Sequence, residues 1–64
     1  MIAYIEGQII LIEKDFITLK TSDGVGYEVY ILKQLSSNLS LKDYLALHIY
    51  TNVKEDDISL YGFK

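Results

Sequence analysis

The sequence predicts an all-β domain of five short strands with one short helical turn between strands three and four. Apolar, β-branched and aromatic residues alternate with polar ones over most of the chain, as in strands with one buried face. Turn-forming residues separate the alternating segments at short intervals. Alternation stops only in residues 32–41, where leucines recur at helical spacing.

The first strand is expected over residues 2–12, with a bulge or bend at Gly7. A polar turn at residues 13–15 leads into a second strand over residues 16–21, which alternates and is rich in β-forming residues.

Residues 22–24, Ser-Asp-Gly, predict a hairpin turn in which Gly24 adopts a positive φ. The third strand is expected over residues 25–31, with a bend or close backbone approach at Gly26.

The helical segment of residues 32–41 contains Ser-Ser-Asn at residues 36–38, and these residues form helices poorly. It is therefore expected to make one turn or a short irregular helix.

The fourth strand is expected over residues 44–53, with a charged hairpin tip at residues 54–57 and a last strand over residues 58–63. Alternation predicts two faces for the fourth strand: Tyr44, Ala46, His48 and Tyr50 on one, and Leu45, Leu47, Ile49 and Thr51 on the other.

Three strands, a break and a two-stranded hairpin is the order of an OB-fold, a five-stranded Greek-key barrel. An SH3-like barrel also has five short strands, but the long bent first strand and the break after the third favour the OB-fold. Barrel closure would remove the free edges of a small sheet. With no internal repeat or linker, residues 1–64 are expected to form a single domain.

The short length and the lack of cysteine limit the stability of the domain. A 64-residue chain buries only about 60% of its unfolded surface, and without cysteine it has no disulfide or thiolate–metal site to stabilise it. A closed fold or a partner subunit must supply the rest of the stability.

No apolar run approaches the roughly 20 residues of a membrane span, and no signal pattern opens the chain. We therefore expect a cytoplasmic protein without membrane contact.

The charge distribution argues against nucleic-acid binding by this domain alone. The net charge is −3, and no arginine is present. Proteins that bind phosphates need clustered basic residues. The six lysines are instead spread along the chain: Lys14, Lys20, Lys33, Lys42, Lys54 and Lys64.

No catalytic residue, cofactor or enzymatic activity of the domain itself is expected. His48 is the only histidine, lacks partner ligands, and is expected to be a partly buried strand residue. The serines show no base–acid spacing around them. The two glycines of residues 23–29, DGVGYEV, precede no helix, so a hairpin turn is favoured over a phosphate-binding loop. The six tyrosines lack a basic groove, so most are expected in a core or interface rather than stacked on bases.

The segment VKEDDISLYGF, residues 53–63, places three consecutive acids beside an apolar strand end. Such acids suit a metal site, a solvated turn, or an element that meets another negative charge. Hard cations need more oxygen ligands than one hairpin tip offers, so no metal is expected.

Three segments resemble the N-terminal OB domain of the RuvA family: MIAYIEGQI at residues 1–9, GVGYEV at 24–29, and VKEDDISLYGF. The resemblance covers essentially the whole chain. It implies that the domain forms a homotetramer and that Glu55 and Asp56 are the acidic pin at the tetramer centre. Asp57 adds a third acid where members often have a small neutral residue, and its role is left open. Lys54 fits a basic position of the family, whereas Tyr4 and Glu6 stand where basic residues are common, which weakens the expectation of DNA-backbone contacts by the first strand.

The resemblance also implies partners and a process. The partners are four-way junction DNA and the RuvB motor of a branch migration helicase complex. The process is recombination and DNA repair. The helix-hairpin-helix domains and the RuvB-binding C-terminal domain would follow residue 64. Two alternatives stay open: a stand-alone OB-fold module that binds single-stranded nucleic acid, and a purely structural subunit-interaction domain.

Overall fold

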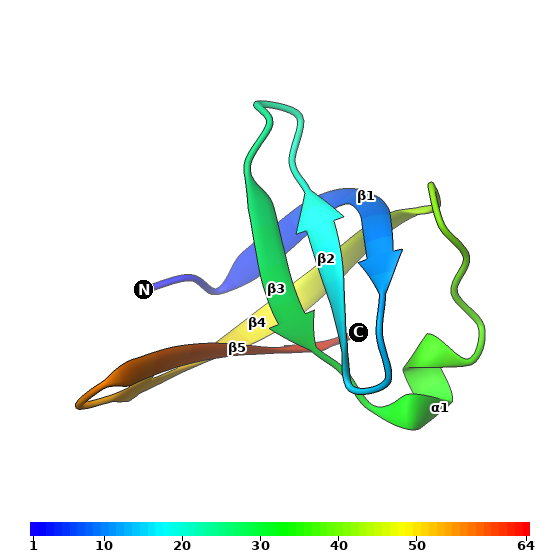
Figure 1. The fold of residues 1–64 in the computed structure, drawn as a ribbon. Coiled ribbons are helices and arrows are strands. Elements are labelled where there is room, and N and C mark those ends of the chain that lie inside the picture. Colours follow the sequence, from blue (N-terminus) through cyan, green and yellow to red (C-terminus); the bar gives the residue numbers. More distant parts are fainter.

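The computed structural model describes all 64 residues as a closed five-stranded barrel with one short helix (Figure 1). The elements are β1 (Tyr4–Ile12), β2 (Phe16–Lys20), β3 (Gly26–Tyr30), α1 (Lys33–Ser36), β4 (Tyr44–Lys54) and β5 (Asp57–Phe63). This confirms the predicted all-β OB-fold class and the order of its elements. Its single short helix has neither the length nor the apolar content needed to cross a membrane.

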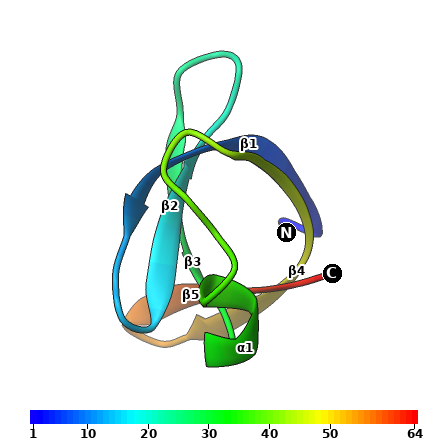
Figure 2. The same ribbon diagram turned by 90° about the vertical axis from the view of Figure 1, so that its right-hand side faces the viewer.

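The strands follow one another round the barrel in the order β1-β2-β3-β5-β4, and only the β3–β5 pair is parallel. Strand β1 curves around one side of the barrel (Figure 2). It pairs with β4 from Tyr4 to Gln8 and with β2 from Gln8 to Ile12. One long bent strand therefore joins the two parts of the barrel.

The irregularity expected at Gly7 falls elsewhere in β1. The register shifts between Ile9 and Leu11, opposite β2. At Gly7 a Cβ would lie against the backbone carbonyl of Lys20. The glycine is needed for close approach of two backbones. Of the two alternatives predicted at this residue, a bulge or a bend, the bulge was wrong.

The core consists entirely of aliphatic side chains. No polar or charged residue is buried. Strand β4 alternates as predicted, with its leucines and Ile49 turned inward. The nine core residues are Ile5, Ile9, Ile17, Leu19, Val29, Leu45, Leu47, Ile49 and Leu60. Complete burial of such a side chain contributes about 1.5–3 kcal/mol.

Most tyrosines were expected in a core or an interface, and only Tyr27 packs against the core, as a partly buried side chain. Their expected place in an interface stays a prediction. None of the six is buried, and Tyr4, Tyr44, Tyr50 and Tyr61 are 41–66% exposed. Branched aliphatic residues already fill the narrow interior, so the tyrosines other than Tyr27 occupy the outward positions of the alternation.

The helical segment is a single turn, as predicted within residues 32–41. Helix α1 lies at one end of the barrel, between β3 and β4 in the chain (Figures 1 and 2). No side chain caps its N-terminus. Leu35 and, beyond the helix, Leu39 pack against the core, so the turn closes this end of the barrel.

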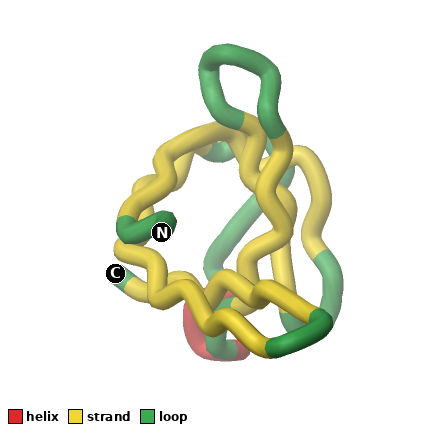
Figure 3. The backbone as a smooth tube through the Cα atoms, turned by 90° about the vertical axis from the view of Figure 1, so that its left-hand side faces the viewer, coloured by secondary structure: helices red, strands yellow, loops and turns green.

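The β4–β5 hairpin projects beyond the rest of the barrel (Figures 1 and 3). Its ladder runs without a break from His48 opposite Phe63 to Lys54 opposite Asp57. On its other side, β5 meets β3 at one position only, Tyr30 opposite Tyr61. Closure therefore leaves the outer half of β5 without a neighbour there, and the expectation that it would remove free edges was wrong for this strand.

Candidate functional site

The tip of the β4–β5 hairpin is a two-residue turn formed by Glu55 and Asp56. The flanking Lys54 and Asp57 face each other as the last pair of the ladder. The tip predicted over residues 54–57 is thus tighter than expected, because two of its residues belong to strands. The continuous β4–β5 ladder ends at this pair, so it fixes where the two acids project.

The acids of the tip are fully available to solvent or to a partner. Glu55, Asp56 and Asp57 are all exposed. The Asp57 carboxylate accepts a hydrogen bond from the Ser59 hydroxyl at 3.0 Å, whereas Glu55 and Asp56 receive none from any side chain. With Lys54 as the only cation among these four residues, the hairpin ends in a negatively charged point.

The acids do not assemble a metal site. No group of three or more His, Asp or Glu side chains is arranged to hold a metal ion. Chemically, the tip can repel an anion or attract a cationic group. It offers no nucleophile and no acid–base pair.

Directly behind the tip, the hairpin exposes a pair of aliphatic side chains that the sequence analysis did not single out. Val53 and Ile58 lie opposite each other and are 63% and 65% exposed. Both continue the inward-facing alternation of β4 and β5 beyond the end of the core. Their alternation was visible in the sequence, but their exposure depends on how far the hairpin projects.

Outward-facing aromatic residues form a second surface, here called the aromatic face: Tyr4, His48, Tyr50, Tyr61 and Phe63. Ring centroids are 5.8 Å apart for Tyr4 and His48, 6.3 Å for His48 and Phe63, and 6.5 Å for Tyr50 and Tyr61. The rings come from three adjacent strands, β1, β4 and β5. His48 is exposed, so its expected partial burial was wrong.

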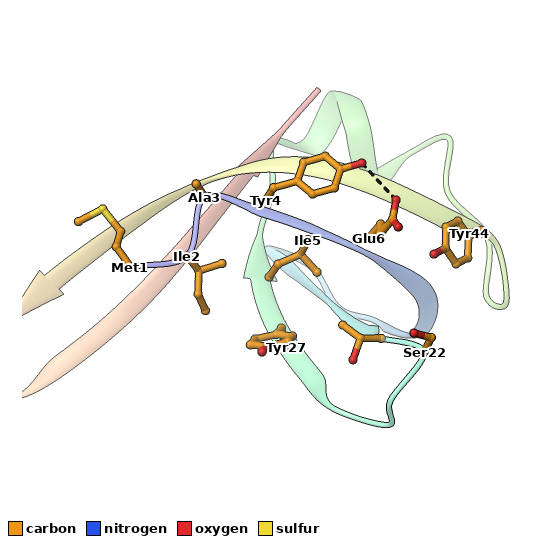
Figure 4. Close-up of a pocket in the computed structure, with 10 residues that line it drawn as sticks. Met1, Ile2, Ala3, Tyr4, Ile5, Glu6, Ser22, Tyr27 and Tyr44 are labelled. Atoms are coloured by element: carbon orange, nitrogen blue, oxygen red, sulfur yellow. Dashed lines mark hydrogen bonds between the residues drawn. The ribbon is translucent and has the colours of Figure 1, made fainter.

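One hydrogen bond marks the rim of the aromatic face. The Tyr4 hydroxyl donates to a carboxylate oxygen of Glu6 at 3.2 Å (Figure 4). That hydrogen bond, reinforced by desolvation and the negative charge of Glu6, raises the pKa of the Tyr4 phenol. Ile5, between them in sequence, points to the opposite side of the strand (Figure 4). The rim is therefore acidic rather than phosphate-binding.

The glycine-containing segment DGVGYEV forms the hairpin turn that was predicted. Gly24 has a φ of +91°, and the Thr21 hydroxyl donates to the Asp23 carboxylate at 2.5 Å. This hydrogen bond, with one from the backbone N–H of Asp23, lowers the pKa of the Asp23 carboxyl. The chain continues directly into β3, so no helix N-terminus is available to bind a phosphate.

Comparison with known families supplies the context for the acidic tip. Residues 1–62 match the family described as the RuvA N terminal domain. The chain belongs to the RuvA N-terminal domain family. In this family member, Glu55 and Asp56 form the turn at the end of the β4–β5 hairpin.

Curated relatives agree with this assignment. The chain is 44% identical over 64 residues to the Holliday junction branch migration complex subunit RuvA of Pelobacter propionicus, covering 100% of the chain and 32% of the relative. It is 43% identical to the RuvA subunit of Campylobacter lari (98% of the chain, 34% of the relative) and 39% identical to that of Nitratidesulfovibrio vulgaris strain Miyazaki F (98% and 32%). The chain spans about a third of the length of these relatives.

The structure brings some predicted residues together and separates others. Glu55 and Asp56 share the tip, and Lys54 and Asp57 flank it as a cross-strand pair. Tyr4 and Glu6 lie on β1, which is not part of this hairpin. The role of the tip acids as a pin remains a prediction.

Proposed function

We propose that this domain is a non-catalytic scaffold of a Holliday junction branch migration complex, where four copies assemble with their hairpin tips beneath the DNA crossover. The observation that carries this proposal is the position of Glu55 and Asp56. They are exposed and unpaired at the end of a continuous ladder, in a domain of the RuvA family. Relatives that match the chain are named as subunits of such a complex.

The proposed mechanism is electrostatic positioning. DNA phosphates and tip carboxylates are both negative, and two unit charges 4 Å apart in water repel by about 1 kcal/mol. Several tips around one axis add these repulsions, which keep the exchanging backbones apart at the crossover. Such selection by repulsion requires attraction from elsewhere. The helix-hairpin-helix domains expected in the complete protein supply it, and the RuvB motor supplies the work of migration.

The aromatic face supports the assembly part of the proposal. Its Tyr4, Tyr50, Tyr61 and Phe63 are 41–60% exposed and lie next to one another on one side of the barrel. Contiguous exposed apolar surface on a small domain marks an interaction site. Because only 11 of 64 residues are buried, covering this face would also add stability that the small core lacks.

A gel-shift comparison tests the proposal. The isolated chain is expected to bind neither a four-way junction nor single-stranded DNA at sub-micromolar concentration and physiological salt, because its lysines are dispersed. A chimera of Pelobacter propionicus RuvA, with its matching segment replaced by this chain, is expected to bind the junction. A folded chimera that leaves the junction free would contradict the proposal. Salt-sensitive binding of single strands by the isolated chain would instead identify a single-strand-binding module.

A further inference from the structure

A groove separates the outer half of β5 from β3. The two strands pair only where Tyr30 meets Tyr61, whereas β4 covers the other edge of β5 from Asp57 to Phe63. Between Asp57 and Ser59, the edge that faces away from β4 therefore has no strand partner. Such an edge presents backbone N–H and C=O groups that can extend the sheet with another chain.

The groove has an apolar lining. Ile2, Tyr27, Ile58 and Leu60 line it, and Ile2 and Tyr27 also pack against the core. Ile58 is 65% exposed, and its cross-strand partner Val53 on β4 is 63% exposed. A strand laid along β5 would cover part of this surface, so its pairing would gain apolar burial in addition to backbone hydrogen bonds.

The charges around the groove are acidic. Glu28 on β3 and Asp57 on β5 both line it, and both are exposed. No lysine lines it. The groove therefore favours positively charged side chains, and its acids disfavour a nucleic-acid backbone.

We propose that this groove binds an extended polypeptide segment in which apolar residues alternate with lysine or arginine, added as a strand along β5. Successive side chains of a strand point to opposite faces. An alternating segment can therefore place its apolar side chains over Ile58 and Tyr27 and its basic ones beside Asp57 and Glu28. Backbone pairing supplies affinity, and the alternation supplies specificity. This inference goes beyond the proposed function because its partner is a protein segment and not DNA.

A second copy of the chain is a poor occupant of the same edge. Pairing two β5 edges with each other would place Asp57 of one copy near Asp57 of the other. Like charges opposite each other destabilise strand pairs. A basic segment removes this repulsion and replaces it with attraction.

The test is an NMR titration of the 15N-labelled chain with a peptide of about six alternating valine and lysine residues, a common strand length. Amide shifts are expected at Ile58, Ser59 and Gly26, but not at Tyr44 on the outside of β4. Binding is expected to weaken as salt is raised, because exposed charges are screened. A peptide of valine and glutamate is expected not to bind. The valine–lysine peptide with alternate backbone nitrogens methylated is also expected not to bind, since it cannot donate the pairing hydrogen bonds.

Charge variants of the chain complete the test. Glu28→Gln combined with Asp57→Asn is expected to weaken peptide binding roughly five-fold. The matched control, Glu13→Gln combined with Asp15→Asn, changes the net charge equally in the β1–β2 turn and is expected to leave binding unchanged. Circular dichroism verifies that both variants fold.

Four results would overturn the proposal: no shifts at millimolar peptide, equal binding of the methylated peptide, equal binding of the acidic peptide, or equal weakening by the control variant. Shifts of the same amides on changing the protein concentration without peptide would assign the groove to a second copy instead. None of these results depends on junction binding, so the proposed function can fail or hold separately.

Discussion

Replacing Gly62 by alanine tests how tightly the barrel closes. Gly62 follows Tyr61, the residue at which β5 meets β3. A Cβ at this position would lie 2.7 Å from Val29 Cγ1 and 2.8 Å from Leu47 Cδ1, and both side chains are almost completely buried. Overpacking of this kind costs about 1–3 kcal/mol. The whole domain has a free energy of unfolding of only about 3–10 kcal/mol at its size.

Thermal unfolding followed by circular dichroism measures this cost. A loss of about 2 kcal/mol lowers the Tm of a domain this small by about 8–16 °C. The control is Gly26→Ala, where the new Cβ would lie 3.4 Å from Thr18 Cγ2, an ordinary contact. Gly26→Ala is expected to keep or raise the Tm, because alanine restricts the unfolded chain. Equal Tm values for the two variants would show that closure at Gly62 is not sterically tight.

Three further predictions concern the core, a turn and the aromatic face. Ile9→Val is expected to lower the free energy of unfolding by about 0.5–1.5 kcal/mol in urea titrations, and Ile10→Val by less than about 0.5, because Ile9 is buried and Ile10 is 48% exposed. Thr21→Val removes the hydrogen bond that lowers the pKa of the Asp23 carboxyl. Because the pKa of Asp23 is lower in the folded state, its carboxylate stabilises the fold at pH values above the unfolded-state pKa. This stabilisation is lost as the pH falls through the folded-state pKa. Thr21→Val should therefore lower the Tm more at about pH 7 than at about pH 2. Tyr50→Ser should reduce self-association in sedimentation experiments with little change in Tm, and unchanged association would exclude the aromatic face as the contact surface.

The sequence predicted the barrel well because its strongest signal is alternation. In β4 every second residue, from Leu45 to Ile49, had to face one side, and the barrel has only one apolar interior. The hairpin tip was equally predictable, since charged residues between two alternating segments leave few other arrangements. Gly24 adopts the positive φ that its place in a turn required.

The errors concern properties that depend on the three-dimensional fit of neighbouring strands. Alternation separates two faces, but it does not reveal that aliphatic residues alone fill the interior, which leaves most of the tyrosines and His48 outside. A glycine in a strand indicates either a bulge or a close approach. Only the position of Lys20 shows that Gly7 serves the second purpose. The open edge of β5 likewise follows from its pairing with β3 at one position only.

The proposed role of Glu55 and Asp56 is to position DNA by repulsion. The most direct test is Glu55→Gln combined with Asp56→Asn in the Pelobacter propionicus RuvA chimera, with Glu13→Gln combined with Asp15→Asn as the control. Because both tip acids are exposed, the free energy of unfolding should change by no more than about 0.5 kcal/mol.

Junction affinity is then measured over a range of salt concentrations, together with branch migration driven by RuvB. The tip variant is expected to bind the junction as tightly as the parent or more tightly, with the largest gain at low salt, where screening is weakest. Its rate of branch migration is expected to change, and the control variant should change neither property. Loss of junction affinity in the tip variant would contradict positioning by repulsion, because the acids would then be contacts rather than repelling charges.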